Sequence, residues 1–304
     1  MSSVGMDERY ARAALSRVVE PGHAKRGDFE DVPPVELWAK VQSGEVQVEE
    51  WTGRAAAVDP VRDLERGLPL GVRFVVPGDD EWPVGMECLR GLPGGEPFGL
   101  WVRGSGHLRL ATERAVSLVG SRACSSYGEH AASELAAGLG VLKWTTVSGG
   151  AYGIDAAAHR GALAAEGSTV AVLACGADVS YPSSNARLFD RIVDGGLVVS
   201  ELPPGASPTK SRFRLRNRLI AAVSRGVVVV EAAERSGALA AAEWATRCGR
   251  ALMAVPGPVT SRQSVGCHGL IRSGGTLVAD VSDILQAVEI PAEVPAAAVA
   301  GAGA

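Results

Sequence analysis

Features that would place this chain in other classes of protein are missing from its sequence. The longest run of branched aliphatic residues is Val227–Val230, far too short to span a membrane. The first ten residues also lack the apolar stretch of a signal peptide. We therefore expect a cytoplasmic protein that does not associate with membranes.

Cysteines are few and show no recognisable pattern. The five of them form no Cys-x-x-Cys pair, and their odd number and their spacing fit neither a zinc site nor a disulfide framework. We expect them to be reduced and mostly buried. No Walker A loop, Ser/His/Asp order or metal-ligand cluster stands out. The sequence thus gives little support to catalysis and predicts neither a metal site nor a cofactor.

Aromatic residues are also scarce, at 5%, whereas 38 residues are glycine and 46% are apolar. This composition favours tight strand-to-helix turns packed with Ala and Val. From Ala115 onward, strand-like apolar runs alternate with helical ones, which predicts an α/β fold with a doubly wound, mostly parallel sheet. The six expected strands cover residues 115–119, 144–147, 169–173, 197–200, 227–230 and 251–255.

The chain before this sheet has helical patterns. Apolar residues recur at helical spacing over 7–19, and Asp59-Pro60 supplies an N-cap followed by proline at the first helical position. We predict a small helical domain over 1–71, a sheet domain over 72–289 with two more short strands at 72–76 and 98–102, and a disordered tail over 290–304.

One cationic segment stands out in a chain with 30 Lys and Arg against 34 Asp and Glu. Between Leu202 and Val230 there are six cations and no acid. Five of them alternate, so an extended backbone would direct them all to one side. Such a patch in a mildly acidic protein indicates a polyanion site, with phosphates as the ligand. The six cations are Lys210, Arg212, Arg214, Arg216, Arg218 and Arg225.

The end of this segment is expected to open a helix, because the residues from Leu219 to Val223 are apolar. Arg216, Asn217 and Arg218 would then lie near a helix N-terminus. Phe213 is either a residue that stacks on a base, as in proteins that bind single strands, or a core residue below the sheet edge.

Glycine-rich turns follow the first two expected strands. Gly120-Ser121-Arg122 precedes an expected helix at 126–139, where free N–H groups and the helix dipole favour an anion. The alternative is a turn with a solvated arginine. The second turn, Ser148–Asp155, lacks the G-x-G-x-x-G order, so we expect no standard dinucleotide site.

Acidic residues near these turns have two possible roles each. Asp155 and His159 lie four apart and could form an acid/base pair, but we favour an aspartate that caps its helix and a histidine that packs with it. Glu201 and Glu231 end expected strands. They could bind a ribose hydroxyl, but we favour carboxylates that accept hydrogen bonds from loop N–H groups.

Together these motifs resemble the DNA-processing protein A (DprA, also called Smf) family over about 72–288. The resemblance implies an extended Rossmann fold that binds single-stranded DNA, acts as a homodimer and loads RecA, without a cofactor. The motifs that carry it include Gly120-Ser121-Arg122, Gly153-Ile154-Asp155, Tyr181-Pro182, Phe213 with Arg216-Asn217-Arg218, and Val255-Pro256-Gly257.

The resemblance also implies which residues meet DNA. Tyr152 stands where the family usually has Arg or Lys, and Arg214 stands where it usually has proline, so we expect a stacking tyrosine and an additional cation there. The residues expected at the DNA are Gly120, Ser121, Arg122, Ser148, Gly149, Tyr152, Gly153, Asp155, Lys210, Arg212, Phe213, Arg214, Arg216, Asn217, Arg218, Ser236 and Gly237.

The leading hypothesis is a non-catalytic recombination mediator that protects single-stranded DNA and promotes RecA loading in transformation or recombination. The alternative is a nucleotide-binding enzyme of related fold, such as a nucleoside monophosphate phosphoribohydrolase. The usual Pro-Gly-Gly-x-Gly-Thr signature of those enzymes is absent, because Pro93-Gly94-Gly95 lies before the sheet begins.

Overall fold

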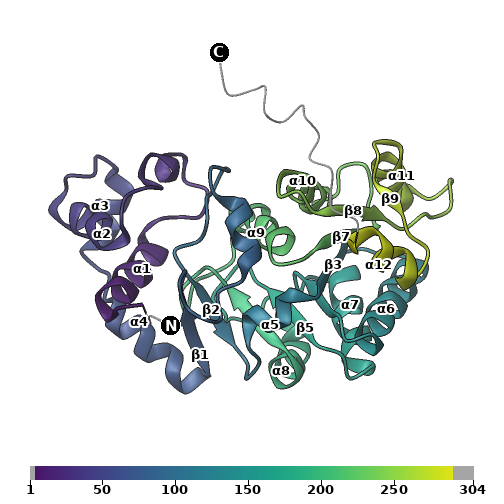
Figure 1. The fold of residues 1–304 in the computed structure, drawn as a ribbon, viewed down its shortest axis with the longest axis horizontal. Coiled ribbons are helices and arrows are strands. Elements are labelled where there is room, and N and C mark those ends of the chain that lie inside the picture. Colours follow the sequence, from purple (N-terminus) through teal and green to yellow (C-terminus); the bar gives the residue numbers. More distant parts are fainter. Residues whose placement is uncertain (1–3, 290–304) are drawn as a thin grey trace, which may run out of the picture.

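A sheet of nine strands runs through the computed structural model, which describes residues 4–289 (Figure 1). The strands are β1 (Val72–Val75), β2 (Leu100–Arg103), β3 (Ala115–Gly120), β4 (Thr145–Ser148), β5 (Thr169–Val172), β6 (Leu197–Ser200), β7 (Gly226–Glu231), β8 (Ala251–Ala254) and β9 (Thr276–Leu277). Their order in the sheet is β1-β2-β6-β5-β4-β3-β7-β8-β9. All neighbours from β6 to β9 pair in parallel, whereas β2 is antiparallel to both β1 and β6.

The predicted α/β fold is confirmed. Parallel strands covered on both faces are apolar along their length, and every residue of β7 is buried. All six predicted parallel strands form, with ends that differ from the prediction by one residue at most. Strand β9 was not predicted, because both of its residues are exposed and carry no apolar pattern.

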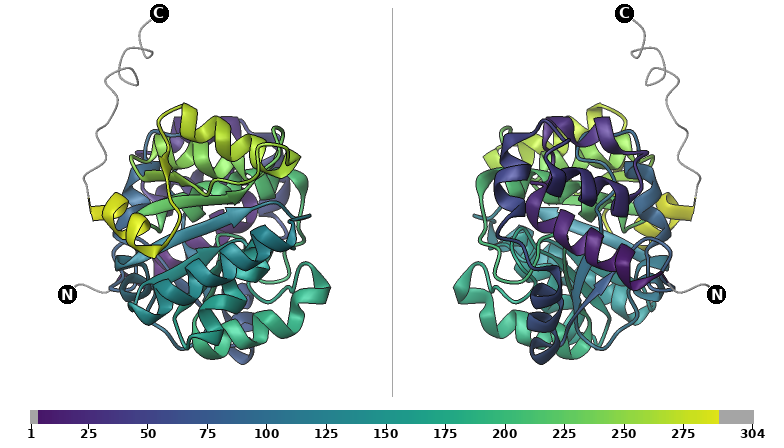
Figure 2. Two further views of the ribbon diagram at one scale, coloured as in Figure 1. Left: turned by 90° about the vertical axis from the view of Figure 1, so that its right-hand side faces the viewer. Right: turned by 90° about the vertical axis from the view of Figure 1, so that its left-hand side faces the viewer.

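Helices cover both faces of the sheet (Figure 2). On one face lie α6 (Ser126–Val141), α7 (Ile154–Ala164), α8 (Ala186–Gly195) and α12 (Val281–Glu289). On the other face lie α9 (Lys210–Ala222), α10 (Leu239–Arg247) and α11 (Val265–Arg272). Successive side chains of a strand point to opposite faces of the sheet, so Leu118 packs on the first layer of helices and Val119 on the second.

The helices predicted before the sheet lie at its β1 end (Figure 1). These helices have their own hydrophobic core, which includes Leu15 and Trp51 and packs against Phe98. The predicted domain boundary falls directly before β1, and the predicted tail at 290–304 lies outside the described residues. These helices are α1 (Met6–Val18), α2 (Pro34–Ser43), α3 (Glu49–Ala55) and α4 (Pro60–Gly67), and α5 (Leu108–Glu113) follows β2.

The strand order reverses where β3 meets β7. From β3 the chain winds through β4 and β5 to β6 on one side, and it continues through β7 and β8 on the other side. In open α/β sheets, ligands bind outside the carboxyl ends of the strands at such a reversal. We call the edge at the carboxyl ends of β3–β8 the C-terminal edge, and the opposite edge the N-terminal edge.

Candidate nucleic-acid interface

The turn after β3 brings Gly120, Ser121 and Arg122 to the C-terminal edge. Gly120 has no space for a side chain, because a Cβ there would collide with Ile154 and with the backbone of Glu231. Ser121 is buried, and its N–H donates to the Glu231 carbonyl at 2.8 Å. Arg122 is exposed and makes no hydrogen bond or ion pair with any residue in 4–289.

The N-terminus of α6 has its own carboxylate. Glu231 accepts hydrogen bonds from the Ser125 N–H at 2.8 Å and from the Ser125 hydroxyl at 2.5 Å. Gly128 leaves room for this carboxylate, which a Cβ at that position would strike. The N-terminus of α6 was expected to favour a bound anion, because of its free N–H groups and the helix dipole. The Glu231 carboxylate supplies that negative charge instead. Glu231 has the structural role that was favoured for it.

A second carboxylate lies at the start of α7. Asp155 accepts the Ala151 N–H at 3.3 Å, whereas the N-cap of the helix is Gly153, so the predicted capping role of Asp155 is wrong. His159 packs in the core, where its Nδ1 lies 2.7 Å from the Thr169 hydroxyl. The two side chains have separate partners and do not form an acid/base pair.

Burial controls the charge of these two groups. It raises the pKa of the Asp155 carboxyl, although Arg216 acts in the opposite direction. It lowers the pKa of His159 to about 3, and repulsion from Arg216 adds to the effect. His159 is therefore an uncharged core residue at neutral pH.

The cationic segment is helical, so the prediction of an extended segment with all five cations on one side is wrong. Thr209 caps α9 and accepts the Arg212 N–H at 3.3 Å. Alternate residues on a helix lie about 200° apart, so the cations are divided between different faces. Arg216 and Arg218 lie in the middle of α9, not near its N-terminus as predicted.

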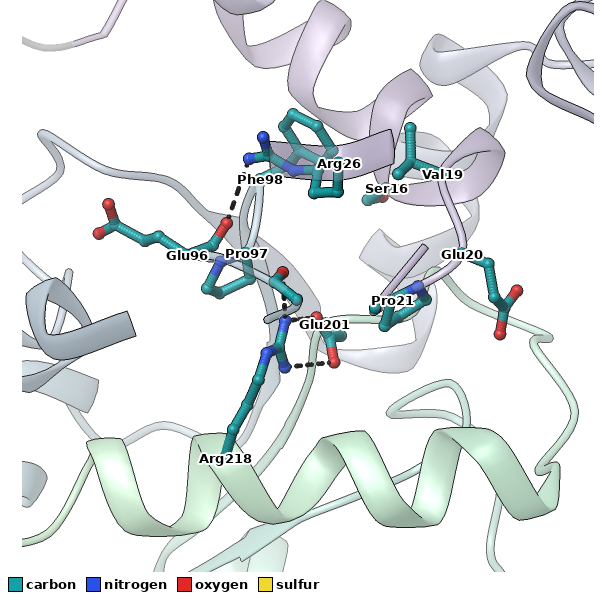
Figure 3. A pocket seen from close by; sticks show the side chains of 12 residues that line it. Ser16, Val19, Glu20, Pro21, Arg26, Glu96, Pro97, Phe98, Glu201 and Arg218 are labelled. Carbon is teal, nitrogen blue, oxygen red and sulfur yellow. Dashed lines mark hydrogen bonds and ion pairs between the residues drawn. The ribbon is translucent and has the colours of Figure 1, made fainter. Parts of the chain in front are cut away.

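Two of these arginines are neutralised by glutamates. Arg212 contacts both carboxylate oxygens of Glu20, at 2.5 and 2.7 Å. Arg218 contacts those of Glu201 at 2.8 and 2.6 Å, and both side chains are buried (Figure 3). Glu201 thus binds an arginine rather than the loop N–H groups that were expected. Neither guanidinium group is free to bind a ligand in this arrangement.

Arg216 is buried as well. Its NH1 group donates to the Gly149 carbonyl at 2.7 Å and to the Val172 carbonyl. These two hydrogen bonds connect the ends of β4 and β5. A Cβ on Gly149 would collide with the guanidinium group. Ser148 is buried below it and donates to the Leu118 carbonyl at 2.6 Å. These residues form the floor of the C-terminal edge.

Arg225 lies at the opposite edge of the sheet, so the prediction that it belongs to the cationic patch is wrong. Its N–H donates to the Ala115 carbonyl at 2.9 Å, where β3 begins. Its Nε donates to the Glu113 carbonyl at 2.8 Å. The six cations are therefore distributed over both edges of the sheet.

Exposed cations come from the turn after β3 and from the helix that carries Phe213. Arg122, Lys210 and Arg214 are exposed, and within the described part of the chain no carboxylate pairs with them. Phe213 is half-buried rather than a core residue, and the Arg122 guanidinium lies 4.9 Å from its ring centroid. A free guanidinium group, the kind of donor that suits phosphate, thus lies next to an aromatic ring at this edge.

Tyr181 lies beside Phe213, with ring centroids 5.6 Å apart. Tyr181 is not among the predicted site residues, although Tyr181-Pro182 is one of the motifs that carry the family resemblance. An exposed aromatic in the turn after a buried strand was the signal that could have identified it. Tyr152, which was predicted, is also exposed, and the Ser184 hydroxyl donates to its hydroxyl at 3.1 Å.

The loop after β7 is held against α9. Asn217 donates through Nδ2 to the Gly237 carbonyl at 3.3 Å. In the same loop, the Ser236 hydroxyl accepts the Ala238 N–H at 3.3 Å. The predicted site residues Asn217, Ser236 and Gly237 are thus brought together.

The structure has two hollows that none of the exposed cations Arg122, Lys210 and Arg214 lines. A cavity of about 20 Å³ next to Arg218 and Glu201 (Figure 3) has room for little more than a water molecule. A larger hollow of about 460 Å³ lies at the N-terminal edge, next to Arg225. Among residues 4–289, no three His, Cys, Asp or Glu side chains are grouped to hold a metal ion. No helix in the same range combines the length and the apolarity needed to cross a bilayer.

Comparison with known proteins gives consistent matches. The sequence model of the family described as DNA recombination-mediator protein A matches residues 73–289. The chain is 46% identical to a putative DNA processing protein DprA of Mycobacterium tuberculosis over 289 residues, which cover 91% of this chain and 74% of the relative. It is 34% identical to Protein Smf of Escherichia coli over 283 residues, which cover 83% and 74%.

Two solved structures are similar to this chain. The X-ray structure of DNA processing protein A from Streptococcus pneumoniae gives a TM-score of 0.77 at 32% identity, covering 94% of this chain and 98% of the other. DNA processing protein A from Helicobacter pylori, described for its single-stranded DNA binding mode, gives 0.61 at 25% identity, covering 70% and 94%.

Proposed function

Because the chain belongs to the DNA recombination-mediator protein A family, we propose that it binds single-stranded DNA along the C-terminal edge and promotes RecA assembly on that DNA. The protein acts without catalysis and as a homodimer in this proposal. The Helicobacter pylori relative, with its single-stranded DNA binding mode, supports the choice of ligand.

The observation that carries the proposal is the exposed Arg122 beside the Phe213 ring, with two more exposed cations, Lys210 and Arg214, on the helix that carries Phe213. Arg122, Lys210 and Arg214 are free to bind phosphates, since no acid neutralises them among the described residues. A half-buried ring next to an exposed cation suits the unstacked bases of a single strand, because every base has a face that stacks. A nucleotide enzyme is not favoured, since the family match indicates a DNA ligand.

The predicted site residues divide into two groups in this proposal. The exposed ones contact DNA. The buried ones, such as Arg216, Gly149 and Asp155, position the loops beneath it. Arg212 and Arg218 belong to the second group while Glu20 and Glu201 neutralise them.

The test is binding of fluorescent oligo-dT, measured by anisotropy at several salt concentrations. Three neutralised phosphates predict a log–log slope of about −2, from about −0.7 per phosphate. A duplex of the same length should bind more weakly, because its bases are stacked and paired. Equal affinity for both ligands, or no binding, would contradict the proposal.

The role toward RecA needs a separate measurement. RecA filament assembly on oligo-dT is followed with and without the protein, and assembly should be faster in its presence. Analytical ultracentrifugation of the full chain tests the homodimer. Incubation with nucleoside monophosphates should release no free base, and release would reverse the choice between mediator and enzyme.

A further inference from the structure

Two of the five cysteines lie next to each other, although they are far apart in the sequence. Cys88 lies on the short 3-10 helix η3 (Val84–Leu89), and Cys248 caps the C-terminus of α10. Both side chains pack in the same hydrophobic cluster, and their thiols lie within hydrogen-bonding distance of each other. All five cysteines are free thiols in this structure, so the pair is reduced.

The segments on both sides of the thiol pair are tightly fixed. A Cβ on Gly85 of η3 would collide with the Ala222 carbonyl, so η3 lies closely against the end of α9. Arg250 donates through NH2 to the carbonyls of Gly85 and Ala222, both at 3.0 Å. Since Cys248 precedes Arg250 by two residues, the same guanidinium group connects the segment of Cys248 to η3. The fold therefore holds the two thiols together.

The two thiols differ in their accessibility. Cys88 is half-buried and lines the hollow of about 460 Å³ at the N-terminal edge. Cys248 is buried, at 7% exposure. A small reagent that enters the hollow thus meets Cys88 first.

The two thiols also differ in acidity. The hydrogen bond with Cys248 holds the pKa of the Cys88 thiol below its ordinary value, and Arg250 adds to this effect. Burial and the charge of Glu96 act in the opposite direction but do not reverse it. The pKa of Cys248 is raised, and burial raises the pKa of the other three thiols as well. Cys88 is therefore the cysteine that most readily becomes a thiolate, the form that reacts with oxidants.

We propose that Cys88 and Cys248 form a redox-reactive thiol pair that hydrogen peroxide oxidises to a disulfide. The Cys88 thiolate attacks one peroxide oxygen, the O–O bond breaks, and a sulfenic acid forms while the other oxygen leaves as hydroxide and is protonated to water. The Cys248 sulfur then attacks the sulfenic sulfur. The S–O bond breaks, and the departing hydroxide takes the Cys248 proton to form a second water. The two thiols lose two electrons in total, which the peroxide gains.

The test adds hydrogen peroxide to the native full chain and counts the remaining thiols after unfolding. Two of the five thiols should be lost, and mass spectrometry should find the peptides of Cys88 and Cys248 joined. Dithiothreitol should restore both thiols. Cys248→Ser should leave Cys88 as a sulfenic acid, which dimedone traps. Cys124→Ser is the matched control, since Cys124 is also half-buried, and it should lose two thiols as the wild-type chain does.

An unchanged thiol count in the wild-type chain would overturn the proposal, and so would a disulfide between any other two cysteines. Two further measurements on the wild-type chain do not depend on a variant that folds. Iodoacetamide should label Cys88 before Cys124, because the thiolate is the nucleophile. The oxidised chain should unfold at a higher urea concentration than the reduced chain, because the cross-link restricts the unfolded state.

Each of these two measurements has an outcome that contradicts the proposal. Faster labelling of Cys124 than of Cys88 would mean that Cys88 is not the reactive thiol. A lower urea midpoint after oxidation would mean that the disulfide distorts the fold, which is incompatible with two thiols that are already in contact.

Discussion

The two edges of the sheet carry similar arginines in different states. At the C-terminal edge Arg122 and Arg214 are exposed and have no acidic partner among the described residues. At the N-terminal edge Arg225 and Arg250 line a hollow of about 460 Å³ and donate to backbone carbonyls at 2.8 to 3.0 Å. The guanidinium groups at the N-terminal edge thus use part of their donors on the protein's own carbonyls, whereas Arg122 and Arg214 use none within residues 4–289. Affinity for a polyanion depends on how many cationic hydrogen-bond donors are still free, not on how many cationic residues are present.

Helix α9 repeats this contrast within one element. Lys210 and Arg214 are exposed, whereas Arg212, Arg216 and Arg218 are held by glutamates or carbonyls. The α9 carbonyl of Ala222 accepts a hydrogen bond from Arg250 at the N-terminal edge. The negative end of the α9 dipole lies at this edge, which disfavours a phosphate there.

The largest effect on stability is expected from Arg218, the buried cation that Glu201 neutralises. Arg218→Ala leaves Glu201 buried without its partner, so the free energy of unfolding should fall by about 3 to 5 kcal/mol. Urea denaturation measures this loss. Arg214→Ala, at an exposed position of the same helix, should change stability by less than about 0.5 kcal/mol. An Arg218 variant of normal stability that binds DNA poorly would place Arg218 at the ligand instead.

A comparison of one arginine from each edge tests which edge binds DNA. Arg122→Ala should weaken oligo-dT binding by about 1 to 3 kcal/mol, because a charge-assisted contact to phosphate is lost. Arg225→Ala should leave the affinity unchanged. Fluorescence anisotropy of both variants decides the matter, and the reverse order of losses would assign the ligand to the N-terminal edge.

The buried His159, which contacts the first residue of β5, should make stability depend on pH. The folded pKa of His159, about 3, lies below its unfolded value of about 6.5, so the unfolded chain binds more protons in this window. The free energy of unfolding should therefore fall as pH decreases from 6.5 toward 3, by up to about 1.4 kcal/mol per pH unit from this group.

Denaturation of His159→Asn at several pH values isolates this contribution, because the slope should become shallower by that amount. His130→Asn, at an exposed position on α6, is the control and should keep the wild-type slope. Identical slopes for all three chains would mean that His159 is not a buried neutral group.

The smallest effect is expected from a substitution that frees a neutralised cation. Glu20→Gln removes the acidic partner of Arg212, so oligo-dT affinity should rise by less than about 1 kcal/mol. The salt slope should steepen by about 0.7 if Arg212 then binds a phosphate. Glu36→Gln, which only releases Lys40 on α2, should change neither quantity. A loss of affinity in the Glu20 variant would show that Arg212 acts through its pairing with Glu20.

The sequence predicted the fold because parallel strands and glycine turns leave local patterns. It placed Gly120-Ser121-Arg122 correctly at the C-terminal edge, since the strand before them is apolar and the edge follows from the topology. It could not predict that Glu20 neutralises Arg212, because the two residues are 192 positions apart. The alternating cations suggested a strand, although Thr209 three residues before Arg212 was a helix-cap signal.

Photocrosslinking tests most directly which edge holds the DNA. Oligo-dT with 5-iodouracil is irradiated on the wild-type chain, and the modified peptides are identified by mass spectrometry. We predict crosslinks in the peptides that contain Phe213, Tyr181 or Tyr152. Crosslinks confined to peptides around Arg225 and Arg250 would contradict the assignment of the C-terminal edge.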